Sequence, residues 1–206
     1  MTYLLRLDSS PRGADSYSRR LGDAVEARAV AAHGLDTVRR RDLDKLNLPH
    51  ISQTTIEGFY TPPEAMTPAL RDATRLSDDL ISELKGAGAI LVTAPIYNFG
   101  APSSLKAWID QIVRIGHTFG YDGTNFEGLV PVSNAYLALA YGSAGYGEGE
   151  PMRAMNHLEP YLTSLLQFLG VASVQTFMVQ GTTGDNAAAL LDAAIQSTHT
   201  HFAAAT

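Results

Sequence analysis

The chain has 206 residues, of which 45% are hydrophobic and 17% charged, and its formal net charge is -6 at pH 7. This length predicts one domain, residues 1–206, that can bury about 70% of its unfolded surface. The lack of cysteine excludes disulfides, thiolate metal sites and a catalytic thiol. The acidic balance argues against a nucleic-acid surface, and no apolar run approaches the roughly 20 residues that cross a bilayer, so we expect a cytoplasmic protein without a membrane partner.

Strand-like runs alternate with amphipathic helices along the chain. The patterns predict strands at Tyr3–Asp8, Asp36–Asp42, Ala89–Ala94, Asn134–Ala140 and Ser173–Val179. They predict helices at Ser18–Ala32, Thr67–Lys85, Met152–Leu169 and Asp185–Phe202. A further helix is predicted after the third strand, with Ser103 or Ser104 as its N-terminal cap. Five such β/α units indicate the α/β class, with a doubly wound five-stranded parallel sheet and helices on both faces.

Three features of these elements and of the segments between them allow more than one interpretation. Arg39–Arg41 lies within a strand, where alternate side chains point to opposite faces, so an edge strand with solvated arginines is favoured over an anion site. Asp44–Pro63 holds three prolines and no clean period, and we expect a long surface excursion. Trp108 falls on the apolar stripe of its helix, which favours packing over a cofactor contact.

The loop after the first strand is rich in serine. In open α/β sheets ligands bind beyond the carboxyl ends of the strands, and residues 9–18 read SSPRGADSYS at that place. Hydroxyls and the free amides of the next helix can bind an anion, although serines that merely cap the helix are an equally good interpretation. Because the loop has neither a P-loop lysine nor GxGxxG, it suits a terminal monophosphate.

Two further loops follow the third and fourth strands. Pro95–Pro102 places two aromatic residues around Asn98, which favours a flat ligand ring over aromatics turned into the core. Residues 140–150 contain four glycines, which allow close approach of a ligand or a mobile flap. A phosphate together with a large planar ring describes flavin mononucleotide (FMN).

With these motifs, the sequence resembles the FMN-dependent NADH-azoreductases, which are flavodoxin-like NAD(P)H:quinone reductases. The resemblance covers nearly the whole chain and rests on Ser9–Ser10, on Ser16–Ser18 at matching spacing and on Ala94–Phe99. It implies a flavodoxin-like fold, bound FMN, NADH or NADPH as electron donor, and quinones or azo compounds as acceptors. It also implies a homodimer with the pocket at the subunit boundary.

The resemblance assigns the cofactor contacts to three loops. They are Ser10, Ser16, Tyr17, Ser18, Ile96, Tyr97, Asn98, Phe99, Ala140, Tyr141, Gly142 and Ser143. The last four stand where the family usually has Ser-Arg-Gly-Gly, and only Gly142 is retained. Gly120 stands where the family commonly has a basic residue, so the substrate end of the pocket is less basic here.

The cofactor has to supply the redox chemistry, because the chain has no cysteine and no evident metal motif. We therefore expect no catalytic side chain and no metal ligand, and a ping-pong cycle in which nicotinamide and acceptor use the same site in turn. The alternative is a flavodoxin-like electron carrier without a substrate of its own. Asp44–Pro63 and Thr118–Phe126 favour an enzyme, since both could wall a substrate cavity.

Two other functional residues can be considered. A serine hydrolase built on Ser143 is disfavoured, because Tyr141 stands where a GxSxG elbow needs glycine. For His117, a capping or structural role is favoured over one on the substrate side.

Overall fold

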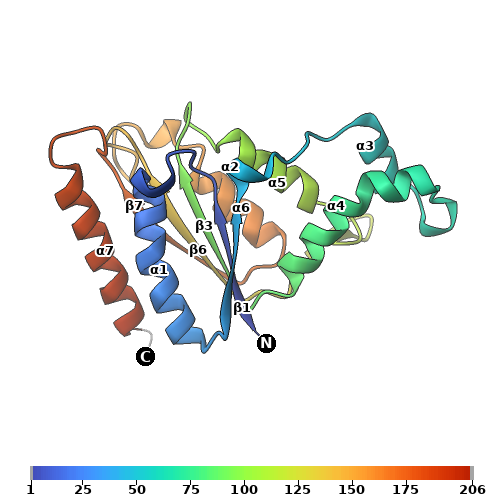
Figure 1. Ribbon diagram of the computed structural model, residues 1–206, viewed down its shortest axis with the longest axis horizontal. Helices are drawn as coiled ribbons and strands as arrows, with labels where there is room; N and C mark the ends of the chain where they lie inside the picture. Colours follow the sequence, from blue (N-terminus) through green and yellow to red (C-terminus); the bar gives the residue numbers. More distant parts are fainter. Residues whose placement is uncertain (1, 205–206) are drawn as a thin grey trace.

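The structure is a computed structural model that describes residues 2–204 (Figure 1). Its strands are β1 (Tyr3–Asp8), β2 (Thr37–Asp42), β3 (Ala89–Pro95), β4 (Phe119–Tyr121), β5 (Phe126–Gly128), β6 (Asn134–Ala140) and β7 (Ser173–Val179). Its α-helices are α1 (Tyr17–His33), α2 (Leu43–Leu46), α3 (Gln53–Tyr60), α4 (Pro68–Lys85), α5 (Ser103–Ile112), α6 (Glu159–Phe168) and α7 (Ala187–Ala204). Three single 3-10 turns add Gly13–Asp15, Pro63–Ala65 and Arg153–Met155.

The main sheet has five parallel strands in the order β2-β1-β3-β6-β7, whereas β4 and β5 form a separate antiparallel hairpin. Parallel pairing turns the carboxyl ends of all five strands to one edge, the upper edge in Figure 1. The predicted five-stranded parallel sheet is confirmed.

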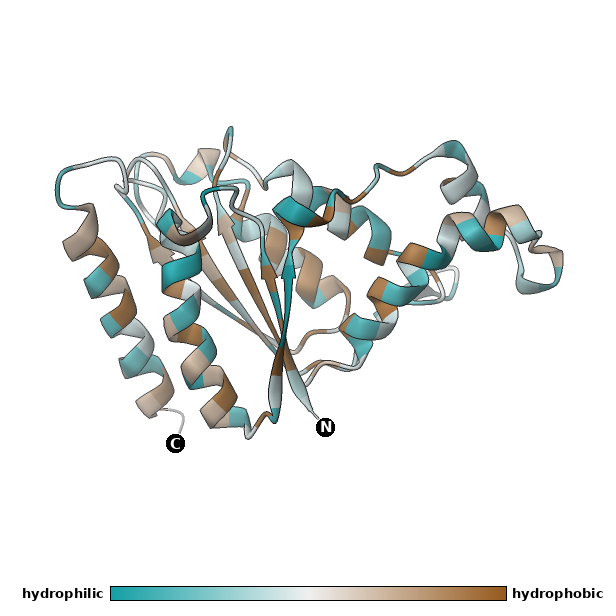
Figure 2. Cartoon of the chain, in the orientation of Figure 1, coloured by the Kyte–Doolittle hydropathy of each residue, from teal (hydrophilic) through white to brown (hydrophobic). Residues whose placement is uncertain are grey.

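Two hydrophobic layers bury the sheet on both faces, as a parallel sheet requires. On one face, side chains of α1 and α7 such as Leu21 and Leu191 pack against Leu4 and Leu91. On the other face, α4, α5 and α6 pack against the opposite side chains of the same strands, and Trp108 lies in this core as the helical spacing predicts. Hydrophobic residues accordingly predominate along the central strands (Figure 2).

Strand β2 is a sheet edge, as its arginines predicted, and is the hydrophilic strand in Figure 2. The Arg39 guanidinium lies 3.8 Å from the centre of the Tyr3 ring. Arg40 pairs with Glu26, and Arg41 donates to Glu83 at 2.8 Å. Each arginine therefore has a partner within the chain, and none of them points to an anion site.

The structure corrects three expectations about the helices. Helix α6 begins at Glu159 instead of Met152, because residues 153–155 form a separate 3-10 turn and the Asn156 side chain then accepts hydrogen bonds from the amides of residues 158 and 159; Leu158 holds the cap position without a side-chain bond. The expected irregular excursion contains α3, which starts where the Ser52 hydroxyl accepts a hydrogen bond from the amide of Thr55 at 3.1 Å. Neither Ser103 nor Ser104 caps α5, since Pro102 holds the cap position without a side-chain bond.

Two features lie away from the sheet. Helix α3 and the start of α4 project to one side of the molecule (Figure 1). The β4–β5 hairpin is attached to the end of α6, where a β-carbon added at Gly128 would collide with the backbone of Gly170. In the part of the chain that the structure describes, no helix has the length and apolar character to cross a membrane.

Candidate active site

Loops at the carboxyl edge of the sheet surround a small cavity of about 170 Å³. Seven residues that the sequence predicted as cofactor contacts line it: Ser10, Ser16, Tyr17, Ile96, Tyr97, Ala140 and Gly142. Sequence reasoning missed four more, namely Arg12, Pro95, Thr182 and Thr183. Ser18, Asn98, Phe99, Tyr141 and Ser143 do not line the cavity.

The first loop brings buried serine hydroxyls to the start of α1. Ser10, Ser16 and Ser18 are almost fully buried. The Ser16 hydroxyl accepts a hydrogen bond from the Arg19 amide at 3.4 Å and lies 3.0 Å from the Ser18 hydroxyl, so Ser16 caps α1. Because the first amides of a helix have no partner within it, the same helix end also offers donors to an anion.

The second loop is a tight turn that holds two aromatic side chains at the surface. The backbones of Tyr97 and Gly100 exchange two hydrogen bonds of 3.0 Å, and between them Asn98 and Phe99 adopt positive φ of 47° and 70°. Asparagine tolerates this left-handed conformation, but phenylalanine rarely adopts it and is strained there. The turn leaves Tyr97 and Phe99 each 40% exposed beside the cavity. The expectation that this loop presents a flat apolar surface is consistent with that arrangement.

The third loop turns both of its aromatic residues, Tyr141 and Tyr146, into the core. Tyr141 is fully buried, and its hydroxyl donates to Oδ1 of Asn156 at 3.3 Å. Burial raises the pKa of the Tyr141 hydroxyl. Only the neighbouring backbone, at Ala140 and Gly142, reaches the cavity.

Two threonines after β7 hold the third loop in place. The Thr182 hydroxyl donates to the carbonyl of Tyr141 at 3.1 Å, and the Thr183 hydroxyl donates to that of Gly142 at 2.9 Å. A signal for them existed in the sequence, since they follow the fifth strand at the edge where ligands bind.

Buried charges lie behind the first loop. Arg6, only 3% exposed, donates to Asp8 at 3.0 Å, to Asp23 at 2.6 Å and to Glu26 at 3.0 Å. Burial disfavours the cation, but these carboxylates outweigh it and raise the pKa of Arg6. Asp8 also accepts a hydrogen bond from the Thr93 hydroxyl at 2.7 Å, which ties β1 to β3 at the base of the loop.

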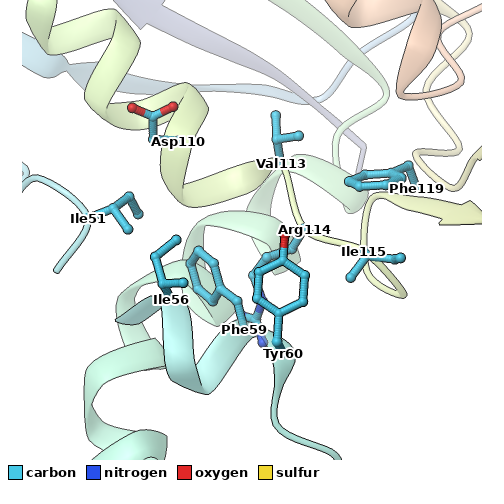
Figure 3. A pocket seen from close by; sticks show the side chains of 9 residues that line it. All are labelled: Ile51, Ile56, Phe59, Tyr60, Asp110, Val113, Arg114, Ile115 and Phe119. Atoms are coloured by element: carbon cyan, nitrogen blue, oxygen red, sulfur yellow. The ribbon is translucent and has the colours of Figure 1, made fainter. Parts of the chain in front are cut away.

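Aromatic and aliphatic side chains gather in a second region, between α3 and the end of α5. Figure 3 shows Ile56, Phe59 and Tyr60 from α3 facing Ile115 and Phe119, and these residues line a cavity of about 430 Å³. A neighbouring cavity of about 610 Å³ shares Phe59, Tyr60 and Ile115.

Arg114 stands between these two cavities. Its guanidinium lies 4.6 Å from the centre of the Phe59 ring and donates to Asp78 at 2.6 Å. His117 lies 3.2 Å from it, and burial together with this positive charge lowers the pKa of the imidazole. The bond to Arg114 is consistent with the structural role expected for His117.

The structure gives no support to a hydrolase. Ser143 is exposed, and within residues 2–204 no histidine or carboxylate forms a hydrogen bond with its hydroxyl. The same range contains no cluster of histidine, aspartate or glutamate side chains that could hold a metal ion.

The fold and the loops at its carboxyl edge define a class of protein. A family model described as a flavodoxin-like fold matches residues 2–202, and the chain belongs to this family. A protein from Xanthobacter autotrophicus named FMN-dependent NADH:quinone oxidoreductase is 53% identical over 175 residues, which are 85% of this chain and 84% of that protein. A Pseudomonas aeruginosa protein named FMN-dependent NAD(P)H:quinone oxidoreductase 1 is 36% identical over 88% of both chains. The crystal structure of an azoreductase from Bacillus anthracis superposes with a TM-score of 0.87 at 25% identity, covering 98% of this chain and 99% of that one.

Proposed function

We propose that this chain, as one domain, is an FMN-dependent NAD(P)H:quinone oxidoreductase that also reduces azo compounds. The observation that carries the proposal is a cavity that joins buried serine hydroxyls to an exposed aromatic turn. The names of the relatives support the cofactor, the donor and the quinone, and the azoreductase structure supports the azo acceptor.

The residues around the cavity fit FMN. Serine hydroxyls and the start of α1 suit its phosphate, and Arg12 is the one charged side chain among the cavity residues. A volume of about 170 Å³ is below the roughly 300–1,000 Å³ of ordinary ligand pockets, so it suits only part of the cofactor. The flavin ring would then extend over Tyr97 and Phe99.

Bound FMN would supply the two-electron redox chemistry, accepting hydride from NADH or NADPH and reducing a quinone or an azo compound. The protein would bind the phosphate through Ser10, Ser16 and the start of α1, and pack the ring against the turn at residues 97–99. Water can supply the protons, so no side chain is required as a proton donor. We propose a ping-pong cycle, in which donor and acceptor occupy the open ring face in turn.

One experiment tests the cofactor and both half-reactions. Purified protein is mixed with FMN, desalted, and followed by absorption before and after anaerobic NADH and then a quinone. We expect a retained flavin spectrum that bleaches with NADH and returns with the quinone. A retained flavin that ignores NADH and NADPH would favour the electron carrier, and no retained flavin would overturn the proposal. Parallel double-reciprocal lines are expected in steady state, and intersecting lines would contradict the ping-pong cycle.

We further propose a homodimer that forms through the second region. Tyr60 is 74% and Phe126 61% exposed, and a contiguous exposed patch of such apolar side chains is typical of a surface that binds another protein. An aromatic surface runs without a break from the second region to the β4–β5 hairpin. Phe119 lines the same cavity as Tyr60, the Phe119 ring contacts the Phe126 ring, and Phe126 stacks on Tyr121. We propose the cytoplasm as the location, where the nicotinamide donor is available.

A further inference from the structure

The carbonyl of Ser10 is held by a forked pair of hydrogen bonds. Arg19, in the first turns of α1, donates to this oxygen from Nε at 3.1 Å and from Nη2 at 2.6 Å. Ser10 lines the cavity, whereas Arg19 does not. Arg19 therefore fixes one side of Ser10 while the other side faces the proposed phosphate site.

Arg19 is itself fixed by the end of strand β2. Nη2 donates to Asp42 Oδ1 at 2.7 Å and Nη1 donates to Oδ2 at 3.0 Å, the two-point geometry in which an arginine–carboxylate pair is strongest. Asp8 lies 3.8 Å away on the other side. The guanidinium is 14% exposed, and its charge is met by these two carboxylates.

The peptide between Ser10 and Pro11 explains why the direction of this carbonyl matters. Proline has no backbone N–H, so this peptide unit carries an acceptor and no donor. Turned toward a bound phosphate, the unit could only repel it. Two hydrogen bonds from Arg19 keep its one polar atom on the side away from the cavity.

We propose that Arg19, held by Asp42, is a positioning residue for the flavin phosphate: it keeps the Ser10 carbonyl out of the phosphate site and so sets the preference for FMN over riboflavin. The inference rests on the proposed function, because it needs FMN in this cavity. Arg19 acts through Ser10 and does not touch the phosphate. Arg12 lines the cavity and is the cation placed to contact it.

The test compares two flavins that differ only in the phosphate. Dissociation constants for FMN and riboflavin are measured by flavin fluorescence for the wild type, Arg19→Met, Arg19→Lys and Arg40→Met. We expect Arg19→Met to lower FMN affinity about 10- to 100-fold, the range for losing a charge-assisted hydrogen bond, and riboflavin affinity by less than about threefold. Arg19→Lys keeps the positive charge but cannot form the paired hydrogen bonds to the Ser10 carbonyl, so it should lower FMN affinity by a smaller factor than Arg19→Met.

Arg40→Met is the matched control, because Arg40 is also ion-paired at β2 but does not contact the loop. It should leave both affinities within about twofold of the wild type. If Arg19→Met does not fold, Arg19→Lys decides. Equal losses of FMN and riboflavin, or unchanged FMN binding in Arg19→Lys, would overturn the inference. Wild-type protein that binds neither flavin would instead overturn the proposed function.

Discussion

The three loops around the proposed FMN cavity and the region between α3 and the end of α5 differ in how well contacts within one chain bury and fix them. In the loops, Ser9 is bound to the Thr93 carbonyl by both its amide and its hydroxyl, and Phe99 accepts a hydrogen bond from the His157 amide at 2.9 Å. On the α3 side, Tyr60 and Phe126 are open to solvent beside two cavities. The comparison shows that bonds within one chain fix the loops, whereas the other region leaves aromatic side chains uncovered, which is the region through which we propose that the homodimer forms.

Removing the buried cation behind the loops should have the largest effect. Arg6→Met takes from the buried Asp8 its ion pair at 3.0 Å and leaves only Arg19 at 3.8 Å, and we expect the free energy of unfolding to fall by about 3–5 kcal/mol in urea denaturation. Arg75→Met, in the exposed Arg75–Asp72 pair, should change it by less than about 1 kcal/mol. Similar losses in both variants would contradict the view that the loops depend on the buried network.

Asn156 joins the second and third loops to α6. Asn156→Ala removes the acceptor for the Tyr141 hydroxyl and for the amides of residues 158 and 159, and the donor to the Tyr146 carbonyl at 3.1 Å. We expect about 2 kcal/mol less stability in thermal unfolding and about tenfold weaker FMN binding, because the neighbouring His157 holds the Phe99 turn. Asn156→Asp, which keeps the acceptor, should lose less. A fully stable Asn156→Ala variant would show that the loops do not depend on this residue.

The exposed aromatic surface can be tested without disturbing the core. Tyr60→Ser combined with Phe126→Ser should shift sedimentation from dimer to monomer and leave FMN affinity of each chain within about threefold, since neither residue lines the flavin cavity. A matched pair of changes at the exposed Arg75 and Asp72 should leave the dimer intact. A monomeric wild type would contradict the proposal that a second copy of the chain covers this aromatic surface.

The smallest expected effect is a pH dependence at His117. Burial and Arg114 hold its pKa below the ordinary 6.5, so the folded chain takes up its proton at lower pH than the unfolded chain. Stability should therefore decline as pH falls from about 7 toward 5, by less in His117→Gln than in the wild type. The exposed His50→Gln should follow the wild type. Urea denaturation across this pH range would contradict the prediction if His117→Gln and wild type decline in parallel.

Periodicity predicted the sheet because apolar runs such as residues 89–94 determine burial locally. It placed the start of α6 wrongly because an apolar period does not reveal the hydrogen bonds by which the Asn156 side chain binds the amides of residues 158 and 159 ahead of the helix. The three loops could be predicted from the rule for open sheets. Contacts such as that of Arg19 with Asp42 could not, because they join residues 23 positions apart whose pairing depends on the completed sheet.

The close backbone contact between Gly128 and Gly170 limits which substitutions the protein tolerates where the hairpin joins α6. Each backbone occupies the space that a side chain of the other would need, so neither position accepts even alanine without moving the hairpin from α6. Phe119 and Phe126 pack against Phe168 at the end of α6, whereas Tyr121 stacks on Phe126 and is 49% exposed. Exchanges at Tyr121 can therefore alter the exposed aromatic surface while the attachment of the hairpin to α6 stays the same.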